Sequence, residues 1–563
     1  MKECIQLITS VNERSSELRS FSTRFAKRWK NYFSLDGLIP GVYPTEEQKH
    51  VVQSNEKQLM IRGSAGSGKS LMLVYRLIKI MEQAEEKNQK ILYVTFNQTL
   101  IDDTRKRLNQ SKSYQELKAK HKVNITTYHD LVRNILMNEC GYQHMPRIVM
   151  NQRSISKHES TISARIFGLL ERMKEDNKYK NMEKLFRTHT AKFLQEEFFW
   201  MKANGIVTLE RYMAKERTGR GQSPQVQVRQ RPTIFYLFER YNEFMETNFP
   251  TPQLDMEDYA LRLLNELNIN PKASFKYDHI LVDEFQDLQP MQIKSLVELT
   301  KGTITLVGDE KQRIYKSSPV SYKELNLKVN RRTRRNLTKN FRSTKQIMNL
   351  ASAIQFDDVE NVREDDQDFF REGPRPKIRY YARNRVLVNA LIREIKLKQK
   401  NNPEKTIAVI HRQNLNQLNK EGSIKRQLER EFDLVGIYDY GKRFNYNKTK
   451  KPIFFTQPYE IKGLEFDYVF IIDFDRFHYP LKDRIDALNK KYGGEKWSDP
   501  NYNKDYDVEY NDEKKILYVA CSRAKEDLYL MYSAKNQMRI STFVRDFRST
   551  DYESNFRKSQ YDN

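Results

Sequence analysis

An octapeptide in the first part of the chain, GSAGSGKS (63–70), fits the pattern GxxxxGK[ST]. It follows a short apolar run and opens a helical pattern, the context in which such a loop binds nucleotide phosphates. Its glycines let backbone N–H groups turn toward the phosphates, and the following helix adds partial positive charge. We expect Lys69 to reach the β- and γ-phosphates and Ser70 to bind Mg²⁺. The remaining loop residues should bind phosphate oxygens: Gly63, Ser64, Ala65, Gly66, Ser67 and Gly68.

Two adjacent carboxylates, Asp283 and Glu284, end a second apolar run in HILVDEFQD (279–287). At the carboxyl end of a buried parallel strand, both side chains can turn toward one ligand. We expect Asp283 to bind Mg²⁺ and Glu284 to accept a proton from the attacking water. Together with the phosphate loop, the pair predicts a nucleoside triphosphatase. A solvated acidic strand end is the alternative.

Short apolar runs that alternate with helical patterns predict the elements that hold these residues. In the first half of the chain they occur at 59–61, 91–96, 125–127, 279–282 and 304–307. Continuous apolar strands between helices are typical of a parallel sheet covered on both faces. A second alternation begins near residue 375, with strands expected at 407–410, 453–455, 468–472 and 528–531. The pattern predicts an α/β fold with two parallel-sheet lobes.

Composition limits the class of protein and its partners. The 563 residues include 99 Lys and Arg against 74 Asp and Glu, a net charge of +25, and 38% are hydrophobic. This apolar fraction excludes wholesale disorder, and the charge favours nucleic acid as a partner. Cys4, Cys140 and Cys521 lie too far apart for a disulfide scaffold or a zinc knuckle. No apolar run approaches the ~20 residues that span a bilayer, so we expect a soluble cytoplasmic protein without a membrane partner.

The chain resembles the superfamily 1 DNA helicases of the UvrD/PcrA/Rep group, because its short motifs follow that family's order. The first four are YPTEEQKHVV (43–52, the Q motif), VTFNQTL (94–100, Ia), TTYHDLVRNIL (126–136, Ib) and DEFQD (283–287, II). The later five are GDEKQRIY (308–315, III), NFRS (340–343, IV), TIAVIHR (406–412, IVa), KGLEF (462–466, V) and YVACSRA (518–524, VI). The resemblance implies two RecA-like lobes with a helical insertion in the first.

Carried over position by position, the resemblance implies a role for each motif residue. Gln48 would contact the adenine of ATP, and Phe341 would stack on it. Gln312, Arg342 and Arg523 would approach the γ-phosphate, while Gly463 and Glu465 would approach the ribose or phosphates. A track for single-stranded DNA would consist of Thr95, Phe96, Asn97, Thr127, Tyr128, His129 and Tyr315. For Phe96, Tyr128 and His129, packing in the protein core is the alternative.

The chain departs from the family pattern at three places. The family has a Trp-Arg-Gly run after motif III, where this chain has KSSP (316–319) and offers Tyr315 or Tyr322 as a substitute ring. Tyr459 stands where the family has a His before motif V. Motifs IV and V are only 121 residues apart, from residue 342 to residue 463. This spacing predicts a compact member of the family that lacks most of the second insertion.

These observations divide the chain into six expected segments. They are a basic helical leader (1–42), lobe 1 (43–130 and 271–335) interrupted by a helical insertion (131–270), lobe 2 (336–545) with an insertion at 476–511, and a polar tail (546–563). Two basic stretches, 215–232 and 327–339, would contact DNA phosphates in place of the missing insertion. Solvated surface charge is the alternative for both stretches.

The expected function is that of an ATP- and Mg²⁺-dependent motor that moves 3′→5′ on single-stranded DNA. The rival is a DNA-stimulated regulatory ATPase within a complex that controls a partner nuclease. Compact helicases of this group occur as subunits of bacterial anti-phage systems such as Gabija. A phosphate-loop kinase or GTPase is disfavoured by Gln48 and by the paired arginines 342 and 523.

Overall fold

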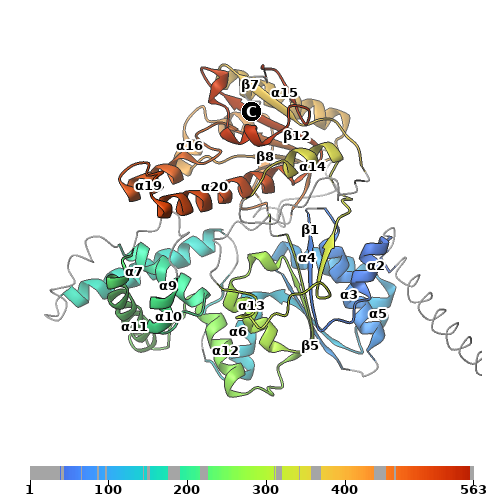
Figure 1. The fold of residues 1–563 in the computed structure, drawn as a ribbon. Helices are drawn as coiled ribbons and strands as arrows, with labels where there is room; N and C mark the ends of the chain where they lie inside the picture. The colour runs from blue at the N-terminus through green and yellow to red at the C-terminus, as the bar shows by residue number, and fades with distance from the viewer. Residues whose placement is uncertain are drawn as a thin grey trace, which may run out of the picture.

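The computed structural model describes residues 38–39, 43–64, 66–84, 88–95, 98–143, 145–148, 152–174, 190–215, 226–309, 311, 320–341, 343–356, 369, 371–436, 452–461 and 464–557. Two parallel sheets with surrounding helices dominate these residues, one below and one above the middle of Figure 1. A separate group of helices lies beside the lower sheet. The α/β fold with two parallel-sheet lobes that the sequence predicted is confirmed.

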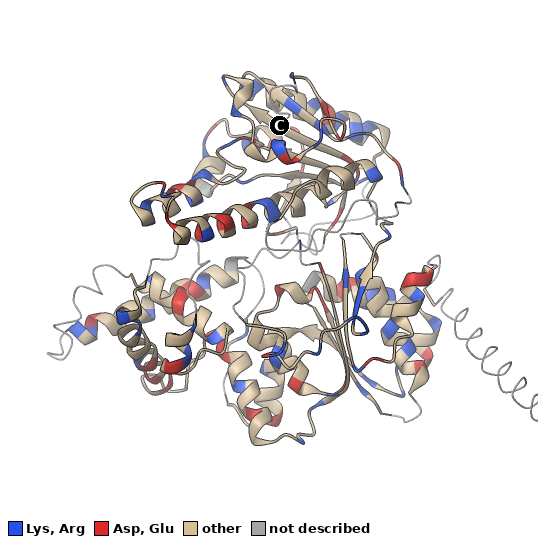
Figure 2. Cartoon of the chain, in the orientation of Figure 1, with Lys and Arg blue, Asp and Glu red and all other residues tan. Residues whose placement is uncertain are grey.

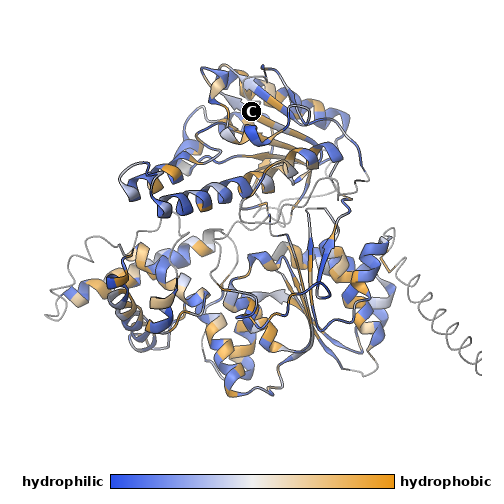
Figure 3. Cartoon of the chain, in the orientation of Figure 1, coloured by the Kyte–Doolittle hydropathy of each residue, from blue (hydrophilic) through white to orange (hydrophobic). Residues whose placement is uncertain are grey.

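The first sheet contains six parallel strands in the order β3-β2-β4-β5-β1-β6. Their bounds are β1 (Gln58–Gly63), β2 (Lys90–Thr95), β3 (Lys122–Thr127), β4 (Tyr277–Asp283), β5 (Thr300–Gly308) and β6 (Arg334–Leu337). The inner strands are apolar because helices cover both faces, as the orange strands of Figure 3 show. Ile61 pairs with Val307 and Asp283 pairs with the same residue. The carboxyl ends of β1, β4 and β5 therefore meet at one edge.

Strand β6 was not predicted, because three of its four residues are polar or charged and it lies inside the basic stretch 327–339. It pairs with β1 at the edge of the first sheet, with Asn336 opposite Arg62 and Leu337 opposite Gly63. Residues 336 and 337, which the sequence assigned to lobe 2, therefore belong to the sheet of lobe 1.

Helices pack on both faces of the first sheet. One face carries α2 (Glu46–Val52), α3 (Lys69–Gln83), α4 (Gln98–Gln110) and α5 (Lys112–Leu117). The other carries α6 (Tyr128–Glu139), α12 (Asp258–Ile269), the short η3 (Phe285–Asp287) and α13 (Pro290–Leu299). Leu131 of α6 and Leu263 of α12 share a core with Leu92 and Val282 of the sheet. All of α12 and all but the first three residues of α6 fall within the predicted insertion 131–270, but both helices pack as part of lobe 1.

The remaining helices of that insertion form their own core. They are α7 (Gln152–Lys174), α9 (Ala191–Ala203), α10 (Leu209–Ala214), η2 (Val228–Gln230) and α11 (Arg231–Thr247). A buried ion-pair network joins this group to the start of α12: the Lys202 ammonium lies 2.8 Å from Asp255, before the helix, and 2.6 Å from Asp258, its first residue. Glu257 is buried beside them, and burial, then the charges of Asp255 and Asp258, raise its pKa to about 8.

The second sheet is also parallel, with the order β13-β7-β12-β11-β8-β10-β9. Its strands are β7 (Lys377–Tyr381), β8 (Ile407–Ile410), β9 (Leu434–Val435), β10 (Ile453–Thr456), β11 (Phe466–Ile472), β12 (Ala524–Ser533) and β13 (Glu553–Ser554). Strand β13 lies within the predicted polar tail 546–563, where Phe547 and Tyr552 are buried in the lobe 2 core. That part of the tail is therefore integral to the lobe.

Among the described residues, lobe 2 contains eight helices, of which α20 is the longest. They are α14 (Lys345–Ser352), α15 (Asn384–Asn401), α16 (Leu415–Asn419), α17 (Ile424–Glu429), α19 (Lys482–Tyr492), α20 (Pro500–Cys521), η7 (Gln537–Arg539) and η8 (Thr542–Asp546). Helix α20 runs without a break for 22 residues and crosses the side of lobe 2 that faces the other elements in Figure 1. The predicted insertion 476–511 ends inside this helix, so its last part is continuous with motif VI.

Buried ion pairs fix α20 within lobe 2. The carboxylate of Glu513 binds Arg412, two residues after the end of β8, and lies 2.9 Å from a guanidinium nitrogen of Arg484. Arg484 also lies 2.8 Å from Glu509. Farther toward the N-terminus of α20, the rings of Tyr502, Tyr506 and other aromatic residues pack against one another. The helix is therefore held along most of its length.

Candidate active site

The phosphate loop connects β1 to α3 at the carboxyl edge of the first sheet. Gly66 and Gly68 have φ values of 90° and 80°, a left-handed conformation that glycine adopts without strain. The Lys69 ammonium donates hydrogen bonds to the carbonyl oxygens of Gly63 and Ser64, both at 2.8 Å. The cation is thus held at the mouth of the loop, where phosphate oxygens could replace the carbonyls.

Asp283 ends β4 directly beside this loop. Its carboxylate accepts hydrogen bonds from the Ser70 hydroxyl, from Tyr93 Oη at 3.0 Å and from the Glu284 backbone N–H at 3.0 Å. Burial, followed by the charge of Glu284, raises the pKa of Asp283 to about 7. Mg²⁺ prefers oxygen ligands, and proteins bind it through only a few side chains. The Ser70 hydroxyl and the Asp283 carboxylate, which are in contact, therefore fit a Mg²⁺ site.

Glu284 takes a left-handed backbone conformation, with φ 53°, at the junction of β4 and η3. This conformation costs a residue with a side chain about 1–2 kcal/mol. Its carboxylate accepts a short hydrogen bond from the side-chain amide of Gln286. The oxygen of that amide accepts the backbone N–H of Asp309, at 3.1 Å, after the end of β5. The carboxylate is therefore held by an amide that also touches motif III.

The two lobes meet close to the phosphate loop. The Phe341 backbone N–H donates to the Gly66 carbonyl oxygen at 3.1 Å, which places the start of motif IV against the loop. The Tyr518 hydroxyl of α20 lies 3.4 Å from a carboxylate oxygen of Asp309. The Lys311 ammonium lies 5.8 Å from the centre of the Phe356 ring. Each of these three contacts joins a residue of lobe 1 to a residue of lobe 2.

Arg523 is buried at the end of α20. Its guanidinium donates hydrogen bonds to the carbonyl oxygens of Val519 and Leu464, at 3.1 and 3.3 Å, and to Ser522 Oγ at 3.1 Å. Glu465, beside Leu464, is partly exposed. In this conformation Arg523 binds groups of its own lobe, so its approach to the γ-phosphate stays a prediction.

The side-chain amide of Gln48 connects the start of α2 to the phosphate loop. The oxygen accepts the Thr45 backbone N–H at 2.9 Å, and the nitrogen donates to the Ser67 carbonyl oxygen at 3.0 Å. The first bond belongs to a capping box that starts α2. The structure therefore fixes Gln48 beside the loop, and its contact with adenine stays a prediction.

The described residues of the expected DNA track are all buried. Tyr128 packs in the core of lobe 1, and its hydroxyl lies 2.7 Å from Ser295 Oγ. Burial lowers the pKa of His129 to about 4, and this ring packs edge-on against Tyr128 and Tyr259. Thr127 caps α6, and Thr95 is buried at the end of β2. In this conformation Tyr128 and His129 pack in the core, the alternative that the sequence left open, and their contact with DNA stays a prediction.

Seven residues of the expected site fall outside the described residues. They are Ala65, Phe96, Asn97, Gln312, Tyr315, Arg342 and Gly463. Much of the basic loop 215–232 and most of the leader 1–42 also fall outside. In the second basic stretch, Arg331 and Arg332 are exposed in the turn before β6, and Arg335 is exposed in β6 itself. Figure 2 shows Lys and Arg in blue on strands and helices of both lobes.

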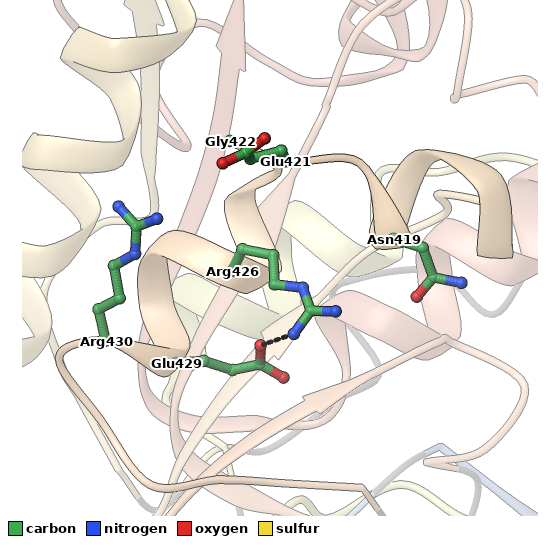
Figure 4. A pocket seen from close by; sticks show the side chains of 6 residues that line it. All are labelled: Asn419, Glu421, Gly422, Arg426, Glu429 and Arg430. Atoms are coloured by element: carbon green, nitrogen blue, oxygen red, sulfur yellow. Dashed lines mark ion pairs between the residues drawn. The ribbon is translucent and has the colours of Figure 1, made fainter.

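An open hollow of about 480 Å³ lies elsewhere, on α16 and α17 of lobe 2. Figure 4 shows its charged lining, in which Arg426 pairs with Glu429 at 3.5 Å. None of its lining residues belongs to the motifs of the expected site. Among the described residues, no three His, Cys, Asp or Glu side chains form a metal-binding cluster, and no helix is long and apolar enough to cross a bilayer.

Sequence reasoning missed Gln286, Tyr93 and Tyr518 as parts of this site. Gln286 carried a signal, because it is an amide within motif II, two positions after Glu284. Tyr93 and Tyr518 carried none, because a tyrosine inside an apolar run is normally a core residue. Their contacts with Asp283 and Asp309 depend on how distant strands and helices meet.

Comparisons with known proteins agree with this arrangement. Residues 44–317 match the family model described as UvrD/REP helicase N-terminal domain, and residues 459–535 match the UvrD-like helicase C-terminal domain. The chain is 22% identical to the ATP-dependent DNA helicase srs2 of Schizosaccharomyces pombe, over 70% of this chain and 43% of that protein. It is also 22% identical to the ATP-dependent DNA helicase PcrA of Staphylococcus aureus, over 65% of this chain and 47% of the relative.

Both relatives are therefore matched over less than half of their own length. A solved C-terminal domain of a possible DNA helicase from Lactobacillus plantarum matches at 18% identity, over 38% of this chain and 99% of that one, with a TM-score of 0.26. That score is too low to bear on the fold. The two domain matches, in the expected order and around the site described above, place the chain in the UvrD-like superfamily 1 DNA helicase family.

Proposed function

We propose that the protein is an ATP- and Mg²⁺-dependent translocase that moves 3′→5′ along single-stranded DNA. The observation that carries the proposal is the placement of Lys69, Ser70, Asp283 and Glu284 at one strand edge where lobe 2 touches lobe 1. Hydrolysis at such a seam is coupled to the closing and opening of the lobes, which is what a motor requires.

Each side chain at the seam between the lobes has a separate role in hydrolysis. Lys69 binds the β- and γ-phosphate oxygens, and Ser70 and Asp283 hold Mg²⁺, which supplies positive charge to those oxygens. A water oxygen forms a bond to the γ-phosphorus while the bond from that phosphorus to the bridging oxygen of ADP breaks. Glu284 accepts the proton of the water. Arg523 and Arg342 from lobe 2 neutralise the transferring phosphoryl group after closure.

The test is ATP hydrolysis by the full chain with and without a single-stranded oligonucleotide. We expect the oligonucleotide to stimulate hydrolysis, and Glu284→Gln to abolish turnover while a fluorescent ATP analogue still binds. Translocation is tested separately by displacement of streptavidin from biotin at either end of the strand. Displacement from the 5′ end alone supports 3′→5′ movement. Absence of DNA-stimulated hydrolysis by the unmodified chain would contradict the proposal.

A second candidate is a DNA-stimulated regulatory ATPase in an anti-phage complex, where it controls a partner nuclease. The connection between β8 and β10 favours it, because its described residues hold only α16, α17 and β9. The large insertion that contacts duplex DNA in the family has no counterpart among them. Strand separation on a 3′-tailed duplex distinguishes the two: stimulated hydrolysis without unwinding favours the regulatory ATPase, and robust unwinding by the isolated chain contradicts it.

A further inference from the structure

We propose that Gln286 is a positioning residue that holds Glu284 in its reactive orientation and connects it, through Asp309, to Tyr518 of the other lobe. The proposal rests on the proposed hydrolysis of ATP at this site. The inference adds to that function a chain of hydrogen bonds from Tyr518 to Glu284. Through this chain, the contact between the lobes determines the orientation of the Glu284 carboxylate.

The amide of Gln286 has one partner for each of its ends. Its nitrogen donates to the Glu284 carboxylate, and its oxygen accepts the Asp309 backbone N–H at 3.1 Å. A glutamine amide is the side chain of this length that offers a donor and an acceptor side by side, so the two partners fix its orientation. Gln286, Glu284 and Asp309 are all at least nine-tenths buried, so the two hydrogen bonds of the amide are shielded from bulk solvent.

The space for the amide depends on the glycine of motif III. A Cβ on Gly308 would lie 2.1 Å from the amide oxygen of Gln286 and 2.8 Å from the Phe285 ring. A side chain at position 308 would therefore push the amide away from Glu284. The end of β5 thus leaves room for the amide and also provides the N–H that orients it.

The chain of hydrogen bonds continues into lobe 2 through the carboxylate of Asp309. One of its oxygens accepts the Lys311 backbone N–H at 3.1 Å, and the other lies 3.4 Å from the hydroxyl of Tyr518. Tyr518 is buried and packs edge-on against Phe356 of the same lobe. It lies on α20, five residues before Arg523. Movement of α20 against lobe 1 therefore makes or breaks the Tyr518 contact at the same time as it moves Arg523.

The experiment measures DNA-stimulated hydrolysis of Mg·ATP by the full chain carrying Gln286→Met, Tyr518→Phe or both. We expect Gln286→Met to lower kcat by about 10- to 100-fold, because a general base displaced from its substrate loses this much. Affinity for a fluorescent ATP analogue should stay within about 2-fold, since Gln286 is not among the residues expected to bind the nucleotide. Tyr518→Phe should lower kcat by about 3- to 10-fold, the effect of one hydrogen bond.

The double variant is the decisive measurement. If Tyr518 acts through Gln286, the double variant should be no slower than Gln286→Met alone, whereas independent effects would multiply. Multiplied effects, or a wild-type kcat in Gln286→Met, would overturn the proposal. If Gln286→Met does not fold, Gln286→Ala replaces it, because it removes both partners of the amide without adding a charge; it too should lower kcat at unchanged ATP affinity.

Matched controls separate positioning from folding. Gln292→Met removes an equally buried amide that caps α13, and Tyr532→Phe removes a buried hydroxyl that binds the Gln537 carbonyl oxygen within lobe 2. Both should leave kcat unchanged, even if they lower the thermal midpoint. An inactive wild-type chain would mean that the proposed function fails. An active wild type with an inactive Glu284→Gln and a fully active Gln286→Met would mean that this inference alone fails.

Discussion

Replacing Glu257 by glutamine should change the pH dependence of stability. Glu257 is buried where the helical insertion joins lobe 1, between Asp255 and Asp258, with the Lys202 ammonium as the nearby positive charge. Its pKa is raised from 4.5 to about 8. Between these two pH values the folded protein keeps a proton that the unfolded chain has lost. Stability contributed by this group therefore falls as the pH rises through that window, and it is constant below 4.5 and above 8.

The magnitude follows from the size of the shift. Each unit of pH inside the window costs about 1.4 kcal/mol, so raising the pH from 5 to 7.5 should destabilise the wild type by about 3 kcal/mol relative to Glu257→Gln. For a unit of 150–250 residues this corresponds to a change of about 6–12 °C in the difference between the two thermal midpoints. Any cost of burying the glutamine amide is the same at every pH, so it does not enter this change.

The assay is the thermal midpoint of the full chain and of Glu257→Gln across pH 5 to 8, followed by circular dichroism. Glu139→Gln, at an exposed position on the neighbouring helix α6, controls for the loss of one negative charge. A difference between Glu257→Gln and the wild type that stays constant with pH would refute the reasoning. It would mean that Glu257 is not held protonated in the fold.

Three further outcomes are expected. Lys69→Ala should lower kcat/KM for ATP by about 100-fold or more, measured by phosphate release, because it removes the cation that the loop holds for the phosphates. Arg412→Ala should lower the free energy of unfolding by about 1–3 kcal/mol in urea titrations, because the buried carboxylate of Glu513 loses one of its two arginine partners and keeps Arg484. The double variant Arg331→Glu/Arg335→Glu should weaken binding to a fluorescent oligonucleotide and reduce the slope of log K against log salt by about 1 per lost phosphate contact. An unchanged kcat/KM for Lys69→Ala would contradict the first expectation, and an unchanged free energy of unfolding for Arg412→Ala would contradict the second. An unchanged salt slope for the double arginine variant would contradict the third.

The strands that the sequence predicted are those with continuous apolar runs, such as β4 and β11. Burial on both faces demands such runs, so local composition is enough to find them. Strand β6 is polar because it lies at a sheet edge, and β13 has two residues, so neither carries that pattern. The phosphate loop and the pair Asp283 and Glu284 could be found because their chemistry depends on neighbours in sequence.

Other parts of the site depend on distant contacts and could not be found this way. Tyr128 and His129 stand at a strand end, where the sequence allows either a surface or a core position. The structure buries both because α12 packs over them. Gln286 gains its partner Asp309 only when β5 lies beside β4, which no local pattern specifies.

Helix α20 has a mechanical consequence for any regulator of this protein. Its 22 residues give it a length of about 33 Å, with the cluster around Tyr502 near its outer end and Tyr518 of the seam near its inner end. Because α20 is fixed within lobe 2, a rotation of that lobe by about 5° around the seam displaces the outer end of the helix by about 3 Å. Trp497, just before the helix, is half exposed there. A molecule that presses on this outer end could therefore adjust the hydrolytic centre from a distance, without entering it.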